Sequence, residues 1–206
     1  MARIVDLSHE IEPGMPVYPG DELMELVQTR WLEKDQHNNH QLRIGMHVGT
    51  HLDAPLHMLP SEQYVSKLPL TSLIGPGCVL DVRNQPLIQW QPNYDRQVPT
   101  GSIILLYTGH DQWYGSDRYF FDHPRVAPEF CEFLLAKRVK LLGMDLPSPD
   151  GPPFPVHKCL LSQGVYLLEN LTNLNQLLDW PSFEVIVLPL RIRADGAPVR
   201  VIARKV

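Results

Sequence analysis

Short apolar runs, separated by turn-forming residues, dominate the hydrophobic pattern of the chain. Seven of them have the length and the aliphatic, β-branched content of strands. Several are apolar at odd and even positions alike, which is typical of strands buried on both faces. The seven predicted strand segments are RIVDLS (3–8), CVLDVR (78–83), SIILLYTG (102–109), VKLLGMD (139–145), GVYLLENL (164–171), FEVIVLPLRI (183–192) and VRVIARKV (199–206).

Three other segments have the apolar period of helices. In VAPEFCEFLLAKR (126–138), Pro128 suits a first turn, and the apolar positions form one stripe. VHKCLLSQG (156–164) predicts a shorter helix that Gly164 can end, and LTNLNQLLDW (171–180) predicts a third. Because strands outnumber helices, the pattern predicts an α/β fold with a mixed, largely buried β-sheet.

The length of the chain and the even spread of its prolines and glycines favour one domain. No internal repeat, low-complexity segment or linker interrupts the 206 residues, and 20 prolines and 13 glycines divide them into short elements. A chain of this length can bury a sizeable core in one unit. We therefore expect residues 1–206 to form a single domain.

Charge and cysteine usage narrow the range of partners and compartments. The net charge of -5 gives no sign of the basic surface that binds nucleic acid. No apolar run approaches 18 residues, and acidic residues come too early at the N-terminus for a signal peptide. Three widely spaced cysteines suit a reducing compartment, and we interpret Cys159 as a buried thiol rather than a nucleophile. The sequence predicts a cytoplasmic protein that binds neither nucleic acid nor membrane.

The densest group of ionisable residues lies in HVGTHLDAPLH, residues 47–57. His47, His51, Asp53 and His57 all occupy odd positions, so an extended chain directs them to one side, opposite a mostly apolar face. A helix would turn Asp53 away from the histidines, and glycine and proline disfavour a helix interior. We predict an extended or irregular segment in which Gly49 allows a bend.

Imidazole and carboxylate groups are suitable ligands for zinc, manganese or iron. The alternative is that the histidines are structural or solvated, as most single histidines are. Unpaired polar groups on a half-buried strand are costly, which favours a shared ligand. The spacing alone leaves metal binding and a structural role both open.

Two further residues are candidates for chemistry. His157 lies where the proline-rich loop DGPPFPVHK enters a predicted helix, so a rigid backbone can aim its side chain; the alternative is a solvated imidazole at a helix start. Glu169 follows apolar neighbours that predict burial, and a buried carboxylate needs a cation or a proton. A metal ion, or an arginine such as Arg191 or Arg193, could serve as the partner of Glu169.

The segment HVGTHLDAPLH resembles the H-x-G-T-H-x-D-x-P-x-H signature of the cyclase family of metal-dependent hydrolases, which includes kynurenine formamidases and isatin hydrolases. The similarity extends to DLSHEIEPGMPVYPGD, LLYTGHDQWYG, LLGMDLPSPDGPPFPVHKCLL and VLPLRIRADGAPVRVIA, and thus to nearly the whole chain. It implies a compact α/β fold with a swivelling β/β/α arrangement, assembled as a homodimer or homotetramer.

The same resemblance implies roles for individual residues. His47, His51 and Asp53 bind one divalent metal ion, and Asp53 also reaches a second ion held with His157 and Glu169. The two ions are expected to be zinc, with manganese as the alternative. His57 is implied to be the catalytic proton donor and acceptor.

Two departures from the formamidase pattern concern the substrate rather than the metal ions. Tyr18 stands where kynurenine formamidases usually have a tryptophan that lines the substrate pocket. Tyrosine can still stack on an aryl ring, although its hydroxyl makes the pocket more polar. Lys158 follows His157 where a second histidine usually stands.

The resemblance implies hydrolysis of a small aryl amide, with N-formyl-L-kynurenine giving L-kynurenine and formate as the leading reaction. In this chemistry a divalent ion makes water acidic near neutral pH and polarises the carbonyl, and His57 transfers the proton. One alternative is a related hydrolase of cyclic amides or esters such as isatin; another is a non-enzymatic module stabilised by metal. A serine hydrolase is disfavoured because the chain has no G-x-S-x-G motif.

Overall fold

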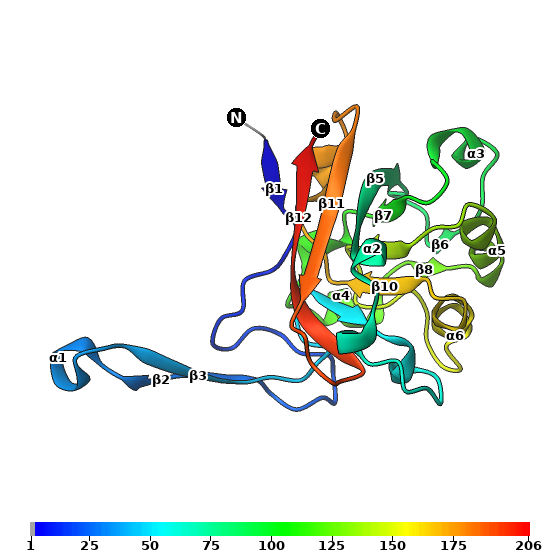
Figure 1. Cartoon of the computed structure of the whole chain (residues 1–206). Helices are drawn as coiled ribbons and strands as arrows, with labels where there is room; N and C mark the ends of the chain where they lie inside the picture. The colour runs from blue at the N-terminus through cyan, green and yellow to red at the C-terminus, as the bar shows by residue number, and fades with distance from the viewer. Residues whose placement is uncertain (1–2) are drawn as a thin grey trace.

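One eight-stranded sheet that closes on itself forms the centre of the molecule, as the computed structural model of residues 3–206 shows (Figure 1). The strand order is β1-β12-β11-β5-β7-β9-β10-β4, and β12 also pairs with β4. Strands β5, β7, β9 and β10 run parallel, and the other pairs are antiparallel. The bounds are β1 Ile4–Asp6, β4 His51–Asp53, β5 Ile74–Asp81, β7 Ile103–Tyr107, β9 Leu141–Met144, β10 Tyr166–Glu169, β11 Phe183–Pro189 and β12 Gly196–Lys205.

Each of the seven predicted strand segments overlaps a strand of this sheet. Every residue of β9 and β10 is buried, as expected for runs that are apolar on both faces. The prediction of an α/β fold with a mixed, largely buried sheet is therefore confirmed. The ten residues of β12 are long enough to pair with β1 and β11 along one part and with β4 along another, and this double pairing closes the sheet.

Two of the three predicted helices are confirmed, as α5 (Pro128–Ala136) and α6 (Pro155–Ser162), which pack against each other beside the parallel strands (Figure 1). The third prediction, a helix over residues 171–180, is wrong. That segment contains only the short 3₁₀ helix η4 (Leu174–Leu177). Asn173 adopts a left-handed conformation and donates from its side chain to the Asp6 carbonyl, while Leu171 bridges to Ser8. Contacts with the N-terminal strand outweigh the helical pattern here.

The other elements that surround the sheet are too short to show a helical or strand period of hydrophobic residues in the sequence. They are η1 Pro55–His57, η2 Val65–Lys67, α2 Leu70–Leu73, α3 Tyr94–Gln97, η3 His110–Trp113, α4 Asp117–Phe121 and the two-stranded sheet of β6 (Leu87–Ile88) and β8 (Arg125–Val126). Within residues 3–206, a helix long and apolar enough to cross a membrane is absent.

A two-stranded hairpin projects from the body (Figure 1). It consists of β2 (Glu25–Arg30) and β3 (Asn39–Arg43), joined through α1 (Leu32–Asp35) at its tip. Sequence analysis missed it, because neither strand alternates apolar and polar residues strictly. We call residues 22–43 the arm.

Closure of the sheet determines where ionisable side chains meet. Strand β4 lies between β10 and β12, with His51 opposite Glu169 and Asp53 opposite Gly196. Side chains that are more than 100 residues apart in the sequence therefore become cross-strand neighbours.

Candidate metal centre

His51 and Glu169 form a buried cross-strand pair. His51 Nε2 lies 3.3 Å from Glu169 Oε2 and 3.5 Å from Asp53 Oδ1. The other ring nitrogen, Nδ1, donates a hydrogen bond to the Gly49 carbonyl at 2.8 Å. That bond assigns the proton to Nδ1 and leaves the lone pair of Nε2 facing the two carboxylates, the orientation that a ligating histidine requires.

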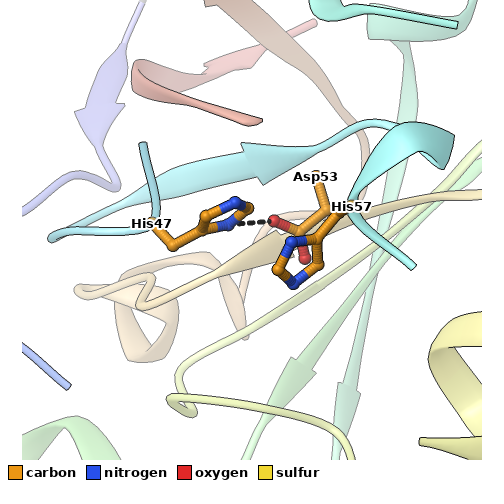
Figure 2. A group of neighbouring side chains, drawn as sticks. All are labelled: His47, Asp53 and His57. Carbon is orange, nitrogen blue, oxygen red and sulfur yellow. Dashed lines mark hydrogen bonds and ion pairs between the residues drawn. The ribbon is translucent and has the colours of Figure 1, made fainter. Parts of the chain in front are cut away.

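Asp53 is the centre of the cluster and is fully buried. Its Oδ1 accepts a hydrogen bond from His47 Nδ1 at 2.8 Å, as Figure 2 shows. Its Oδ2 lies 3.7 Å from His157 Nε2 and has no hydrogen-bond partner. Burial raises the pKa of Asp53, but the surrounding histidines outweigh it and hold the pKa well below the usual range. Asp53 is thus an ionised carboxylate with one unsatisfied buried oxygen.

His157 approaches from the first turn of α6. Its Nε2 lies 3.3 Å from Glu169 Oε1, and its Nδ1 donates to Asp150 Oδ1 at 2.5 Å. The other oxygen of Asp150 accepts from the Val156 amide at 2.6 Å, so one carboxylate both satisfies the start of α6 and orients the imidazole. Burial lowers the pKa of His157, but the hydrogen bond to Asp150 and the negative charges of Glu169 and Asp53 raise it to about 10.

His47 stands between two carboxylates. Its Nε2 lies 2.9 Å from Asp195 Oδ2, opposite the bond to Asp53. Burial lowers the pKa of His47, but the hydrogen bonds to Asp195 and Asp53 raise it to about 10. An imidazole in this position satisfies both carboxylates by carrying two protons, and a cation would satisfy them equally. Metal binding by His47 therefore requires release of a proton.

His57 lies at the end of η1, on the open side of the cluster (Figure 2). Its ring centroid is 3.9 Å from that of His47, and its Nδ1 is 3.5 Å from Asp195 Oδ2. Burial lowers the pKa of His57, so the neutral imidazole predominates near pH 7. A ring nitrogen of His57 also comes close enough to His47 and Asp53 to be counted among candidate ligands.

The cluster fits a divalent metal ion. Ligand atoms of His51, Asp53 and Glu169 lie within 4.8 Å of one another. Asp53 Oδ2 and Glu169 Oε1 are buried without a hydrogen-bond partner, and such atoms are costly unless a cation or proton satisfies them. The arginine alternative for Glu169 finds no support among residues 3–206, because histidines alone form ion pairs with this carboxylate, and Arg193 contacts Tyr64.

Three residues of the site were missed by sequence analysis. Asp150 and Asp195 orient His157 and His47, and Gly196 makes room for His47, since a Cβ atom at Gly196 would lie 2.5 Å from that ring. Only Asp150 left a local signal, as an acidic residue shortly before a predicted helix. Asp195 and Gly196 join the site only because β12 pairs with β4 in the folded chain.

A cavity of about 310 Å³ opens beside the cluster and is lined by His57, His157 and Glu169 on its polar side. Its apolar side includes Tyr18, Phe120 and Tyr114, and Tyr18 meets Phe120 edge-to-face with ring centroids 5.8 Å apart. Tyr18 therefore lines the cavity, and its contact with a substrate stays a prediction. Lys158 does not line this cavity; its ammonium group donates to the Pro153 carbonyl.

Comparison with known proteins identifies the family of the chain. The model of the Cyclase family matches residues 5–151, and the chain belongs to this family. A relative is the kynurenine formamidase of Salinibacter ruber, 33% identical, with 98% of this chain and 97% of the relative covered.

Solved structures extend the likeness to the fold. One is described as a predicted metal-dependent hydrolase from Bacillus stearothermophilus, 25% identical, with a TM-score of 0.80 and full coverage of both chains. Isatin hydrolase A from Labrenzia aggregata has a TM-score of 0.85 at 24% identity, covering 98% of this chain and 93% of that one, and this likeness concerns the fold alone.

We expect the purified protein to contain up to two divalent ions per chain, as measured by elemental analysis. Removal by a chelator should lower the melting temperature, because Asp53 and Glu169 then lose a cation that neutralises them. His51→Ala should lose metal, whereas His110→Ala, a matched change at a buried histidine outside the cluster, should retain it. A metal-free preparation with full activity would contradict this assignment.

Proposed function

We propose that this protein is a metal-dependent amide hydrolase of the arylformamidase type, acting on N-formyl-L-kynurenine or a close analogue. The proposal rests on two buried carboxylate oxygens, one on Asp53 and one on Glu169, that have no hydrogen-bond partner. They lie at the edge of a cavity lined by aromatic side chains. The relationship to kynurenine formamidase supports the choice of an amide substrate.

We assign the ligands to two overlapping sets. His47, His51 and Asp53 would hold one ion, and Asp53, His157 and Glu169 would hold the other. Imidazole and carboxylate donors favour zinc, with manganese as the alternative. When bound, the ions supply a Lewis acid and make water acidic enough to ionise near neutral pH.

His57 would transfer the proton. Its neutral ring, held beside Asp195, accepts a proton from the attacking water and returns it to the leaving nitrogen as the carbon–nitrogen bond breaks. The products are an aryl amine and formate. Tyr18 and Phe120 would hold the aryl ring so that the amide carbon faces the cluster.

The proposed compartment is the cytoplasm. Cys78, Cys131 and Cys159 all lie in the described part of the chain and carry free thiols, which suits a reducing environment.

The direct test is an activity screen of the metal-loaded protein on N-formylkynurenine, formanilide and isatin. We expect a higher kcat/KM on N-formylkynurenine and formanilide than on isatin, because the first two carry a formamide on an aryl ring and isatin carries a cyclic amide. Turnover of isatin without formamidase activity would instead assign the protein to ring-opening hydrolysis. Absence of turnover on all three by fully loaded protein would contradict the proposal.

His57→Ala should lower kcat about 10²- to 10⁴-fold, the usual contribution of a general acid–base group, without loss of metal. His47→Ala should lose metal and activity together. Metal stoichiometry measured beside kcat in both variants separates the two roles. If His57→Ala empties a metal site, His57 is a ligand and the proton passes through another group.

Tyr18→Ala should raise KM for an aryl substrate by up to about tenfold, since an aromatic contact contributes about 0.5–1.5 kcal/mol. Metal content should stay unchanged. Tyr18→Phe is the matched control, because it keeps the ring and should keep the KM. Equal KM values in all three proteins would show that Tyr18 does not contact substrate.

A further inference from the structure

Asn170 is a buried residue that lies directly after the candidate ligand Glu169, and the backbone turns at this point. It is 6% exposed and has a φ of 56°, a left-handed conformation that asparagine adopts more readily than most residues. Its amide donates to the Leu146 carbonyl at 2.9 Å, and its carbonyl accepts from Thr50 Oγ1 at 2.6 Å. The backbone of Asn170 is therefore anchored to the segments that follow β9 and precede β4.

The side chain of Asn170 reaches the same carbonyl group that orients His51. Asn170 Nδ2 donates to the Gly49 carbonyl at 2.9 Å, and His51 Nδ1 donates to that oxygen at 2.8 Å. The two nitrogens lie 3.3 Å apart, as expected for two donors that share one acceptor. With the ring proton on Nε2 instead, the lone pair of Nδ1 would face the lone pairs of the Gly49 oxygen, which is unfavourable. The shared carbonyl thus favours one tautomer of His51.

Tyr119 determines which way the Asn170 amide faces. Its hydroxyl donates to Asn170 Oδ1 at 2.8 Å, and its side chain, from α4, is fully buried. Burial raises the pKa of Tyr119 well above its ordinary value, so the hydroxyl keeps its proton. A flipped amide would replace the bond to Gly49 by a contact between two acceptor oxygens. The amide therefore has one favoured orientation, with its nitrogen at Gly49.

The turn before β4 has other contacts that hold it in place. Strand β4 pairs with β10 and β12 through its backbone, and the Thr50 hydroxyl adds its bond to the Asn170 carbonyl. What the Asn170 side chain adds is a bond to the one acceptor that His51 Nδ1 uses. Its specific effect is therefore on the direction of the imidazole rather than on the path of the chain.

We propose that Asn170 is a positioning residue of the metal centre. Its amide, oriented by Tyr119, fixes the Gly49 carbonyl and so keeps the proton of His51 on Nδ1. Nε2 then presents its lone pair to the two buried carboxylates of the cluster, where an ion would bind. Replacement of a group that orients a ligating histidine typically weakens metal binding about 10- to 100-fold. This inference rests on the proposed role of His51 as a ligand and is independent of the substrate.

The affinity for zinc, measured by competition with a chromophoric chelator, is the first test. Asn170→Gly removes the side chain but keeps a residue that tolerates a positive φ, so it should weaken zinc binding about 10- to 100-fold. Tyr119→Phe removes only the hydroxyl that orients the amide, and it should weaken binding by up to about tenfold, as the loss of one hydrogen bond predicts. Both variants should keep the circular dichroism spectrum of the wild type.

Two matched changes serve as controls. Asn173→Gly removes another left-handed asparagine, whose side chain donates to the Asp6 carbonyl. Tyr94→Phe removes the hydroxyl of another buried tyrosine, which accepts a hydrogen bond from Gln85 Nε2. Both controls should keep the zinc affinity of the wild type, whatever stability they lose.

Nitrogen NMR of the histidine side chains in the zinc-loaded protein tests the mechanism itself. The wild type should show a single tautomer of His51, with the proton on Nδ1. Asn170→Gly should shift the Nδ1 signal and speed the exchange of its proton with water, because the Gly49 carbonyl is then less firmly held. A general loss of stability, as in Asn173→Gly, should leave this signal in place.

Wild-type zinc affinity and unchanged His51 signals in Asn170→Gly and Tyr119→Phe would overturn the proposal while the metal centre itself stands. An equal loss of affinity in Asn173→Gly would also overturn it, since the effect would then be general destabilisation. If Asn170→Gly does not fold, Tyr119→Phe decides by the same two measurements. A wild type that binds no zinc would overturn the ligand assignment and this proposal together.

Discussion

A carboxylate that is wholly removed from water is the constraint on which the site depends. Asp53 sits in a three-residue strand between β10 and β12, and an ionised group there is costly unless positive charge surrounds it. Three histidines reach it from a turn, from its own strand and from the first turn of α6. Each imidazole is oriented by another acceptor, the carbonyl of Gly49 or the carboxylate of Asp195 or Asp150.

The sequence was informative where the chemistry is local. His47, His51, Asp53 and His57 fall within eleven residues, so the sequence could predict their convergence in an extended or irregular segment with a bend at Gly49. Only residues 51–53 form a strand. Gly49 turns the chain before it, with a positive φ of 65°, and η1 turns it afterwards. Backbone turns, rather than a period of two, bring the four side chains together.

The sequence carries no local signal for residues that are brought together from distant segments. Gly196 and Asp195 belong to the site only because β12 closes the sheet against β4, and no local pattern reports such a pairing. The arm escaped prediction because most of its apolar residues are exposed, and only Met24 and Leu26 pack in a hydrophobic cluster at its base. The false helix at 171–180 has the same origin, since its apolar residues pack as a strand bridge and a 3₁₀ turn. Residue roles that the resemblance implies, such as proton transfer by His57, remain predictions.

The sheet closes at β4, and the buried charged residues of the site lie at this same join. Strand β4 has only three residues, so few backbone hydrogen bonds hold it between β10 and β12, and two buried carboxylates lie there, Asp53 within β4 and Glu169 opposite His51. Without a metal ion these carboxylates depend on the protonated histidines around them, and a bound ion would draw both carboxylates to a single centre. The join should therefore open and reclose as a local unfolding unit whose population depends on the free concentration of the ion. Metal supply would then affect the stability of the folded protein as well as its activity.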